Sequence, residues 1–120
     1  MNAELKQELI DWGVNWEEVK ARLVGNEDLV EKFMLKFIDD PSMERLKKGL
    51  DNNDPKEAFQ GAHALKGVAS NLALEGDGFL NQIKEITEIL RPERIDNAPQ
   101  VYEKLRPKYD ELIRILSKYK

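Results

Sequence analysis

The stretch DPKEAFQGAHALKGVASNL, residues 54–72, determines which side of a helix faces a core. It opens with the clearest helix start in the chain, because Asp54 can cap the helix, Pro55 suits its first position and Glu57 stands at the third. A helix turns by about 100° per residue, which brings five small or apolar side chains onto one narrow stripe: Ala58, Ala62, Leu65, Ala69 and Leu72. The stretch therefore predicts an amphipathic helix, which we expect to end near Leu74, before the turn-forming residues 75–78.

His63 is the only histidine in the chain, and it points roughly 140° away from the middle of that stripe. Lys66, Gly67 and Ser70 follow it by three, four and seven residues, a spacing that places side chains along the same helix surface. Glycine inside a helix costs about 1 kcal/mol relative to alanine, and close packing does not explain Gly67 on the face opposite the core. The pattern predicts that another molecule comes close to the His63 ring.

These residues fit phosphoryl chemistry. A neutral imidazole carries a lone pair that can attack phosphorus. A lysine three residues later can then pair with a phosphoryl group that carries about −1.5 to −2 charges. His63 and Lys66 are therefore the candidate acceptor and its cation.

At this point the sequence resembles the histidine phosphotransfer (HPt) family of bacterial and fungal phosphorelays. That family carries an H-x-L-K-G core, a stretch of small residues and then an apolar residue paired with glycine or alanine. Here these parts are HALKG at residues 63–67, VASN at 68–71 and Leu72-Ala73. The resemblance covers nearly the whole chain: residues 25–37 look like the first bundle helix of the family, and residues 50–54 look like the turn before its histidine helix. Ala73 stands where many members have glycine, and alanine is also small.

The resemblance implies a role for each residue of the motif. His63 accepts a phosphoryl group from the aspartate of a receiver domain, or from a histidine kinase, and passes it on. Lys66 orients or neutralises the phosphoryl group, and Gly67 leaves room for the active site of the partner. The implied partner is the receiver domain of a response regulator or of a hybrid histidine kinase.

Direct transfer places further demands on the surface around His63. The donor aspartate must come within a few ångströms of the imidazole, so we expect the partner to dock on the residues that surround it. Phe59, Gln60 and Ser70 are the candidate partner-binding residues, together with neighbours from the following helix.

Each candidate also has an ordinary structural explanation. A single helical histidine is more often a surface or capping residue than a reactive one, and Lys66 alone would be a solvated charge. The hydroxyl of Ser70 could bond back to a carbonyl of its own helix, and Phe59 could be half-buried as part of the core. It is the five-residue context that favours function.

Two other functions stay open. One is a helical adaptor that binds signalling partners without phosphorylation and retains the motif as scaffold. The other is the phosphoacceptor domain of a chemotaxis-type kinase, cut from a longer chain. No Gly-rich phosphate loop and no metal-binding carboxylate set accompanies His63, so we expect a phosphoryl carrier without its own kinase active site, cofactor or metal.

Composition limits the remaining classes. A length of 120 residues suits one domain, residues 1–120, which we expect to be a monomer. The chain has no cysteine, so it has no disulfide framework or thiolate site. The net charge of −4 comes from 19 basic and 23 acidic residues without a basic stripe, which argues against nucleic acid as a partner. We find no signal peptide and no apolar run near the ~18 residues of a membrane span, and expect a cytoplasmic protein.

The other helical segments also have clear start and stop signals. Periodicity and capping signals predict helices over residues 15–25, 26–53 with an interruption at Pro41, 79–90, and about 98–119 with a kink or local break at Pro107. Their apolar stripes can bury one another only in a bundle. We therefore expect an all-α fold: a four-helix antiparallel bundle, with short N-terminal helices that carry Trp12 and Trp16 packed as a lid.

Overall fold

The helix that carries His63 begins where the sequence predicts. In the computed structural model, which describes residues 1–120, the Asp54 side chain caps helix α5 (Pro55–Asn71) by accepting the Glu57 N–H at 3.1 Å. The Glu57 carboxylate does not complete the capping box. It pairs instead with Arg45 of helix α4 (Ser42–Asp51), with 2.5 Å between Nε and the carboxylate. Glu57, the second residue of the expected capping box, thus links α5 to α4.

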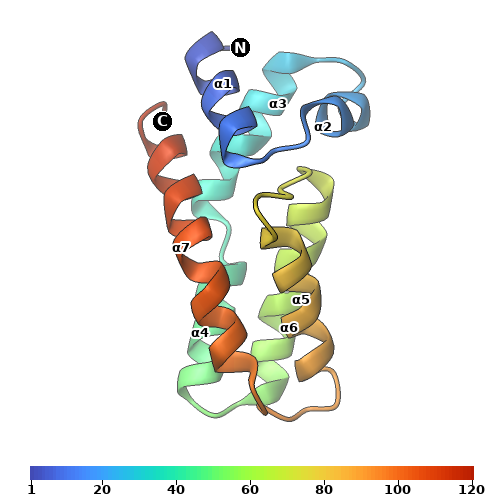
Figure 1. Cartoon of the computed structure of the whole chain (residues 1–120), viewed down its shortest axis with the longest axis vertical. Helices are drawn as coiled ribbons and strands as arrows, with labels where there is room; N and C mark the ends of the chain where they lie inside the picture. The colour runs from blue at the N-terminus through green and yellow to red at the C-terminus, as the bar shows by residue number, and fades with distance from the viewer.

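The fold is all-helical, as predicted. Helix accounts for 74% of the residues, and there is no strand. Besides α4 and α5, the elements are α1 (Ala3–Trp12), α2 (Trp16–Arg22), α3 (Glu27–Lys36), the 3₁₀ turn η1 (Phe37–Asp39), α6 (Phe79–Leu90) and α7 (Ala98–Ser117). Helices α4, α5, α6 and α7 run along the long axis, whereas α1 and α2 lie at one end (Figure 1). None of the helices combines the length and the apolar character that a membrane span requires.

The capping signals and the proline at residue 41 act as predicted. Asn15 and Asn26 each accept a hydrogen bond from the backbone N–H three residues later, at 3.2 and 3.1 Å. Pro41 separates α4 from the preceding turn η1. The His63 helix ends at Asn71, three residues before the expected Leu74, because Leu72 and Ala73 form a turn in which Ala73 has a left-handed φ of 51°.

The break expected at Pro107 is absent, because α7 continues from Ala98 to Ser117 without interruption. Proline removes the N–H that would bond the carbonyl of Glu103, four residues earlier. Both residues are exposed, so solvent can hydrate this carbonyl and the helix need not end. Of the two expected outcomes, the local break was wrong, whereas a kink in the continuous helix stays a prediction.

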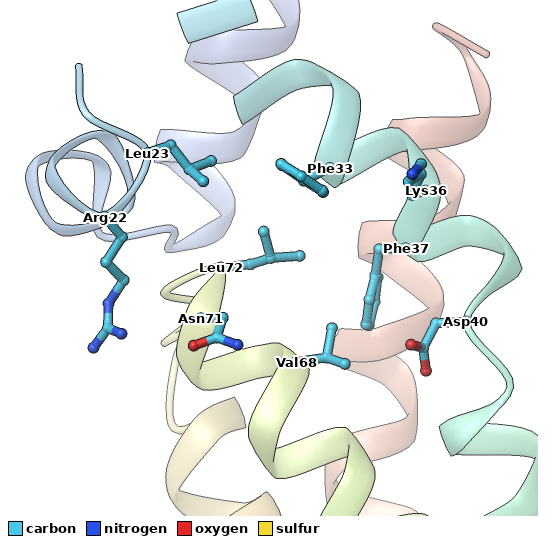
Figure 2. A pocket seen from close by; sticks show the side chains of 9 residues that line it. All are labelled: Arg22, Leu23, Phe33, Lys36, Phe37, Asp40, Val68, Asn71 and Leu72. Atoms are coloured by element: carbon cyan, nitrogen blue, oxygen red, sulfur yellow. The ribbon is translucent and has the colours of Figure 1, made fainter. Parts of the chain in front are cut away.

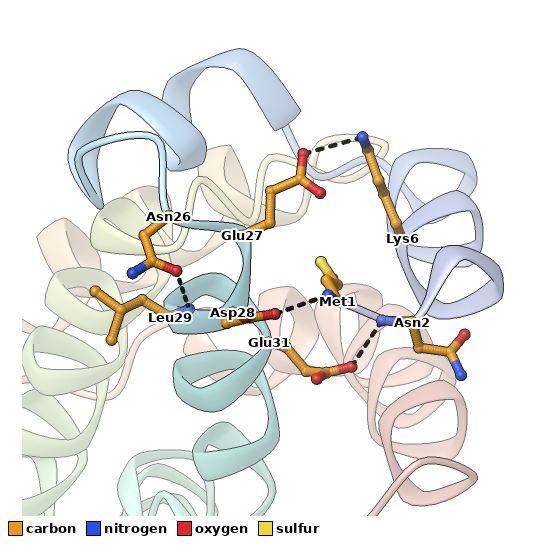
Figure 3. A network of polar contacts seen from close by, with 8 residues as sticks. All are labelled: Met1, Asn2, Lys6, Asn26, Glu27, Asp28, Leu29 and Glu31. Carbon is orange, nitrogen blue, oxygen red and sulfur yellow. Dashed lines mark hydrogen bonds and ion pairs between the residues drawn. The ribbon is translucent and has the colours of Figure 1, made fainter.

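Polar contacts join α1 to α3 at the end of the molecule (Figure 3). The amino group of Met1 contacts Asp28 at 2.7 Å, the Asn2 N–H donates to Glu31 at 3.2 Å, and Lys6 pairs with Glu27 at 3.2 Å. Exposed pairs of this kind contribute little to stability, because solvent screens their charges. The larger contribution comes from apolar side chains of α1 that are fully buried, namely Leu5 and Leu9.

The N-terminal helices also contact the end of the α5–α6 hairpin. The Gly76 N–H donates to the Gly13 carbonyl at 2.8 Å, and the Asn15 N–H donates to the Ala73 carbonyl at 3.0 Å. Trp12 adds a bond from its Nε1–H to the Lys108 carbonyl of α7, at 2.9 Å. The segment between α1 and α2 is thereby held directly against the turn that follows the His63 helix.

Two glycines bring α4 and α5 into backbone contact. A Cβ atom on Gly61 would lie 2.4 Å from the Leu46 nitrogen, and one on Gly49 would lie 2.3 Å from the Ala58 nitrogen. Both approaches are shorter than any side chain allows, so only glycine fits. The contact turns the stripe of α5 inward, and all five predicted stripe residues are buried.

This packing predicts opposite effects for the same substitution at two positions of α5. Gly61→Ala should lower the free energy of unfolding by about 1–3 kcal/mol, because the new methyl group overpacks against the α4 backbone. Gly67→Ala is the matched control, since its Cβ meets nothing within 4 Å. It should raise the free energy of unfolding by about 0.5–1 kcal/mol through helix propensity. Urea unfolding followed by circular dichroism measures both, and equal effects would contradict the packing described.

Candidate functional site

The structure places His63 on the exposed side of α5, opposite the buried stripe. Lys66 and Ser70 are half-buried and Gly67 is exposed on the same side. At a rise of 1.5 Å per residue, these three positions lie within about 10 Å of His63 along the helix axis. The residues that the sequence singled out for phosphoryl chemistry therefore share one accessible face.

Gly67 leaves a gap beside His63. A Cβ atom at this position would meet no atom within 4 Å, in contrast to Gly61 on the other side of the same helix. Packing within the chain therefore does not require a glycine here. The open surface expected from the sequence is present next to the imidazole.

Phe59 lies one turn before His63, and its ring is stacked beside the imidazole. The two rings are stacked, with centroids 5.6 Å apart and planes inclined by 17°. Phe59 is half-buried, and the guanidinium carbon of Arg91 lies 5.2 Å from the centroid of its ring. Phe59 thus connects the exposed histidine to the end of α6.

Helix α6 brings a pair of charges to this side of α5. Arg91 donates from Nε to Glu88 Oε2 at 2.9 Å, and its Nη2 lies 2.8 Å from the same oxygen. The hydrogen bond from Arg91 lowers the pKa of Glu88, and the positive charges of Arg91 and Lys66 add to this effect. The charge of Lys66 therefore acts on an acidic group of the neighbouring helix, although the two form no ion pair.

The side chains of Gln60 and Ser70, the two remaining candidates, make no hydrogen bond within the chain. Gln60 is exposed, three residues before His63. The Ser70 hydroxyl does not make the back-bond to a preceding carbonyl that Thr87 makes to Ile83 at 2.7 Å. Both side chains therefore remain free to meet a partner.

A cleft of 520 Å³ lies farther along α5, between its C-terminal end and helices α2 and α3 (Figure 2). Its apolar lining comes from Leu23, Phe33, Phe37, Val68 and Leu72. Arg22, Lys36, Asp40 and Asn71 supply the polar part of the wall. Val68 and Asn71 follow His63 by five and eight residues, about 8 and 12 Å along the helix. The cleft is therefore close to the His63 face but separate from it.

Sequence reasoning did not identify Glu88, Arg91 or the cleft. Glu88 and Arg91 carry an ordinary charged pattern three residues apart, and nothing in it indicates which side of α6 meets Phe59. The walls of the cleft come from α2, α3 and α5 and from residues next to them, which only the folded chain brings together. The structure contains no group of three or more side chains placed to share a metal ion.

No protein-family model matches the chain, and neither a curated protein nor a solved structure matches it significantly.

Proposed function

We propose that this chain is a histidine-containing phosphotransfer protein of the HPt type. It accepts a phosphoryl group on His63 from the aspartate of a receiver domain, or from a histidine kinase, and relays it to a response regulator. The observation that carries the proposal is the exposed His63, followed on its own helix face by Lys66 and by the open surface at Gly67. The HALKG motif at residues 63–67 supports the same assignment.

The chemistry needs little from this chain beyond the imidazole. A ring nitrogen attacks phosphorus with its in-plane lone pair, an N–P bond forms, and the P–O bond to the donor carboxylate breaks. The carboxylate leaves with the electron pair, and reversal of the step passes the group to the next aspartate. Lys66 pairs with the phosphoryl oxygens through a charge-assisted contact. The partner domain supplies the aspartate and the metal ion, so this chain acts as a carrier.

The proposal includes an architecture. The segment α3–η1–α4 and helices α5, α6 and α7 correspond to a four-helix antiparallel bundle, and α1 and α2 to a lid over one end. Packing of α4 on α5, α5 on α6, α6 on α7 and α7 on α4 supports this assignment. A location in the cytoplasm, where receiver domains act, follows from the proposed role.

The second candidate is a helical adaptor that binds partners without phosphorylation. The observation that favours it is the apolar cleft, which offers a binding surface that does not include His63. The two functions differ in one measurable respect, because the adaptor acquires no phosphate.

The first test is phosphate acceptance by the wild-type chain and by His63→Gln. Incubation with a panel of phosphorylated receiver domains should give acid-labile, base-stable phosphate on the wild type and none on the variant. His63 is exposed, so the variant should keep the helicity and melting temperature of the wild type. Labelling that persists in His63→Gln would place the acceptor elsewhere, and an unlabelled wild type would favour the adaptor.

The second prediction concerns Lys66. Lys66→Ala removes a charge-assisted contact to the phosphoryl group, so transfer should slow, or the phosphohistidine should decay faster, by about tenfold. Lys104→Ala is a matched control, since it deletes an exposed lysine on α7. Time courses of labelling and of phosphate loss measure both rates. Equal rates in the two variants would show that Lys66 is only a surface charge.

The third prediction concerns the docking surface. An unphosphorylated receiver domain should perturb the amide signals of Phe59, Gln60, Gly67 and Ser70, over an interface on the order of 1,200 Å² or less. Gly67→Gln should fold at least as stably as the wild type and lose transfer, because its side chain fills the gap beside His63.

Perturbations confined to residues around Trp12 and Trp16, with the His63 face unaffected, would contradict this docking model. A Gly67→Gln variant that is destabilised but transfers normally would show that the glycine serves packing.

A further inference from the structure

The stack beside His63 contains side chains from two helices. The Phe59 ring lies nearly parallel to the imidazole, at 5.6 Å and 17°, and Arg91 of α6 lies 5.2 Å from the Phe59 centroid. Glu88 in turn holds the Arg91 guanidinium through contacts of 2.9 and 2.8 Å. The series Glu88, Arg91, Phe59 thus leads from α6 to the acceptor ring.

An exposed histidine on a helix surface has several rotamers available to it. Transfer requires the one in which a ring nitrogen points at phosphorus, and holding the reacting atoms in that geometry removes an entropic barrier. His63 has no hydrogen bond that could select a rotamer, so its contact with Phe59 is what restricts the ring. Phe59 can do this because it is itself half-buried and contacted by Arg91.

The geometry of the stack suits a nucleophile. The lone pair of an imidazole nitrogen lies in the plane of the ring, and Phe59 is stacked nearly parallel to that plane. The edge that forms the N–P bond therefore stays open. A centroid separation of 5.6 Å also falls within the usual range for attractive aromatic pairs, about 4.5–7 Å.

Arg91 and Lys66 have different surroundings, although both are cations near His63. Arg91 is engaged by Glu88 and lies over Phe59, whereas Lys66 forms no ion pair. Lys66 is therefore available to a phosphoryl group, and Arg91 acts through the phenyl ring. Sequence reasoning assigned Phe59 to the partner interface and did not identify Arg91.

We propose that Phe59 and Arg91 are positioning residues that hold the His63 imidazole with its nitrogen edge toward the incoming phosphoryl group. This inference rests on the proposed phosphotransfer function and deepens it. It predicts that substitution of either residue lowers the rate of transfer inside the docked complex, beyond any effect that Phe59 has on docking as part of the partner surface.

The first experiment tests the stack without any reaction. Because His63 is the only histidine, the imidazole C–H signals of the whole chain come from one ring in a ¹H–¹³C spectrum. Phe59→Leu removes the aromatic face that shields these protons, so their signals should move downfield, whereas Phe59→Tyr should keep them in place. Arg91→Gln should move them part of the way. Unchanged signals in Phe59→Leu would overturn the proposal.

The second experiment separates positioning from docking. Single-turnover transfer is measured against the concentration of whichever phosphorylated receiver domain reacts fastest with the wild type. Phe59→Leu should lower the maximal rate, which is reached at saturating receiver domain and so does not depend on docking, by about two- to tenfold, the range expected for losing one aromatic contact. Phe59→Tyr should restore the rate. Arg91→Gln should lower it less, and Arg114→Gln is the control for loss of one exposed arginine charge.

Three outcomes would count against the inference. A maximal rate unchanged in Phe59→Leu, with normal transfer by the wild type, overturns positioning and leaves the proposed function intact. A higher half-saturating concentration with an unchanged maximal rate would make Phe59 a docking residue only. Absence of transfer from every receiver domain to the wild type removes the proposed function, and positioning with it. Because Phe59 is half-buried, melting curves are recorded for each variant, and the exposed Arg91→Gln tests the same stack without changing the core.

Discussion

The arrangement of this molecule depends on the backbone contact between α4 and α5. Gly49 and Gly61 allow an approach in which any Cβ atom would lie 2.3–2.4 Å from a backbone nitrogen of the other helix. Such a contact permits only a narrow range of rotations of α5 about its axis. The rotation that it selects buries Ala58 and Ala62 and leaves His63 on the outside. The Arg45–Glu57 pair holds the first turn of α5 against α4 in the same orientation.

Helix α5 therefore uses glycine for two opposite purposes within seven residues. Gly61 is buried where another helix must come close, and Gly67 is exposed where nothing in the chain comes close. Each costs helix stability relative to alanine. At Gly61 the close packing of α4 offsets that cost. At Gly67 no contact within the chain offsets the cost. The open surface there is therefore better explained by the approach of another molecule.

The second helix of the site is α6. It places Arg91 against Phe59 and Glu88 within electrostatic reach of Lys66, so the surroundings of His63 are built across the α5–α6 pair. The N-terminal helices contact the far end of α5. There the Asn15 N–H donates to the Ala73 carbonyl, and Arg22 and Leu23 line the cleft. The His63 face and the apolar cleft are consequently two neighbouring surfaces of one helix, with different chemistry.

The sequence by itself determined the helices, most of their ends and the outward direction of His63, because these depend on periodicity and on local capping by residues such as Asp54 and Asn26. It also indicated the gap at Gly67. Only the tertiary structure decided the use of Glu57 in a link to Arg45, the continuity of α7 through Pro107, the contact of Arg91 with Phe59 and the cleft. The physical reason is that periodicity defines which side of a helix is apolar but not its offset or its distance from its neighbours. Those two quantities decide which side chains from distant parts of the chain meet.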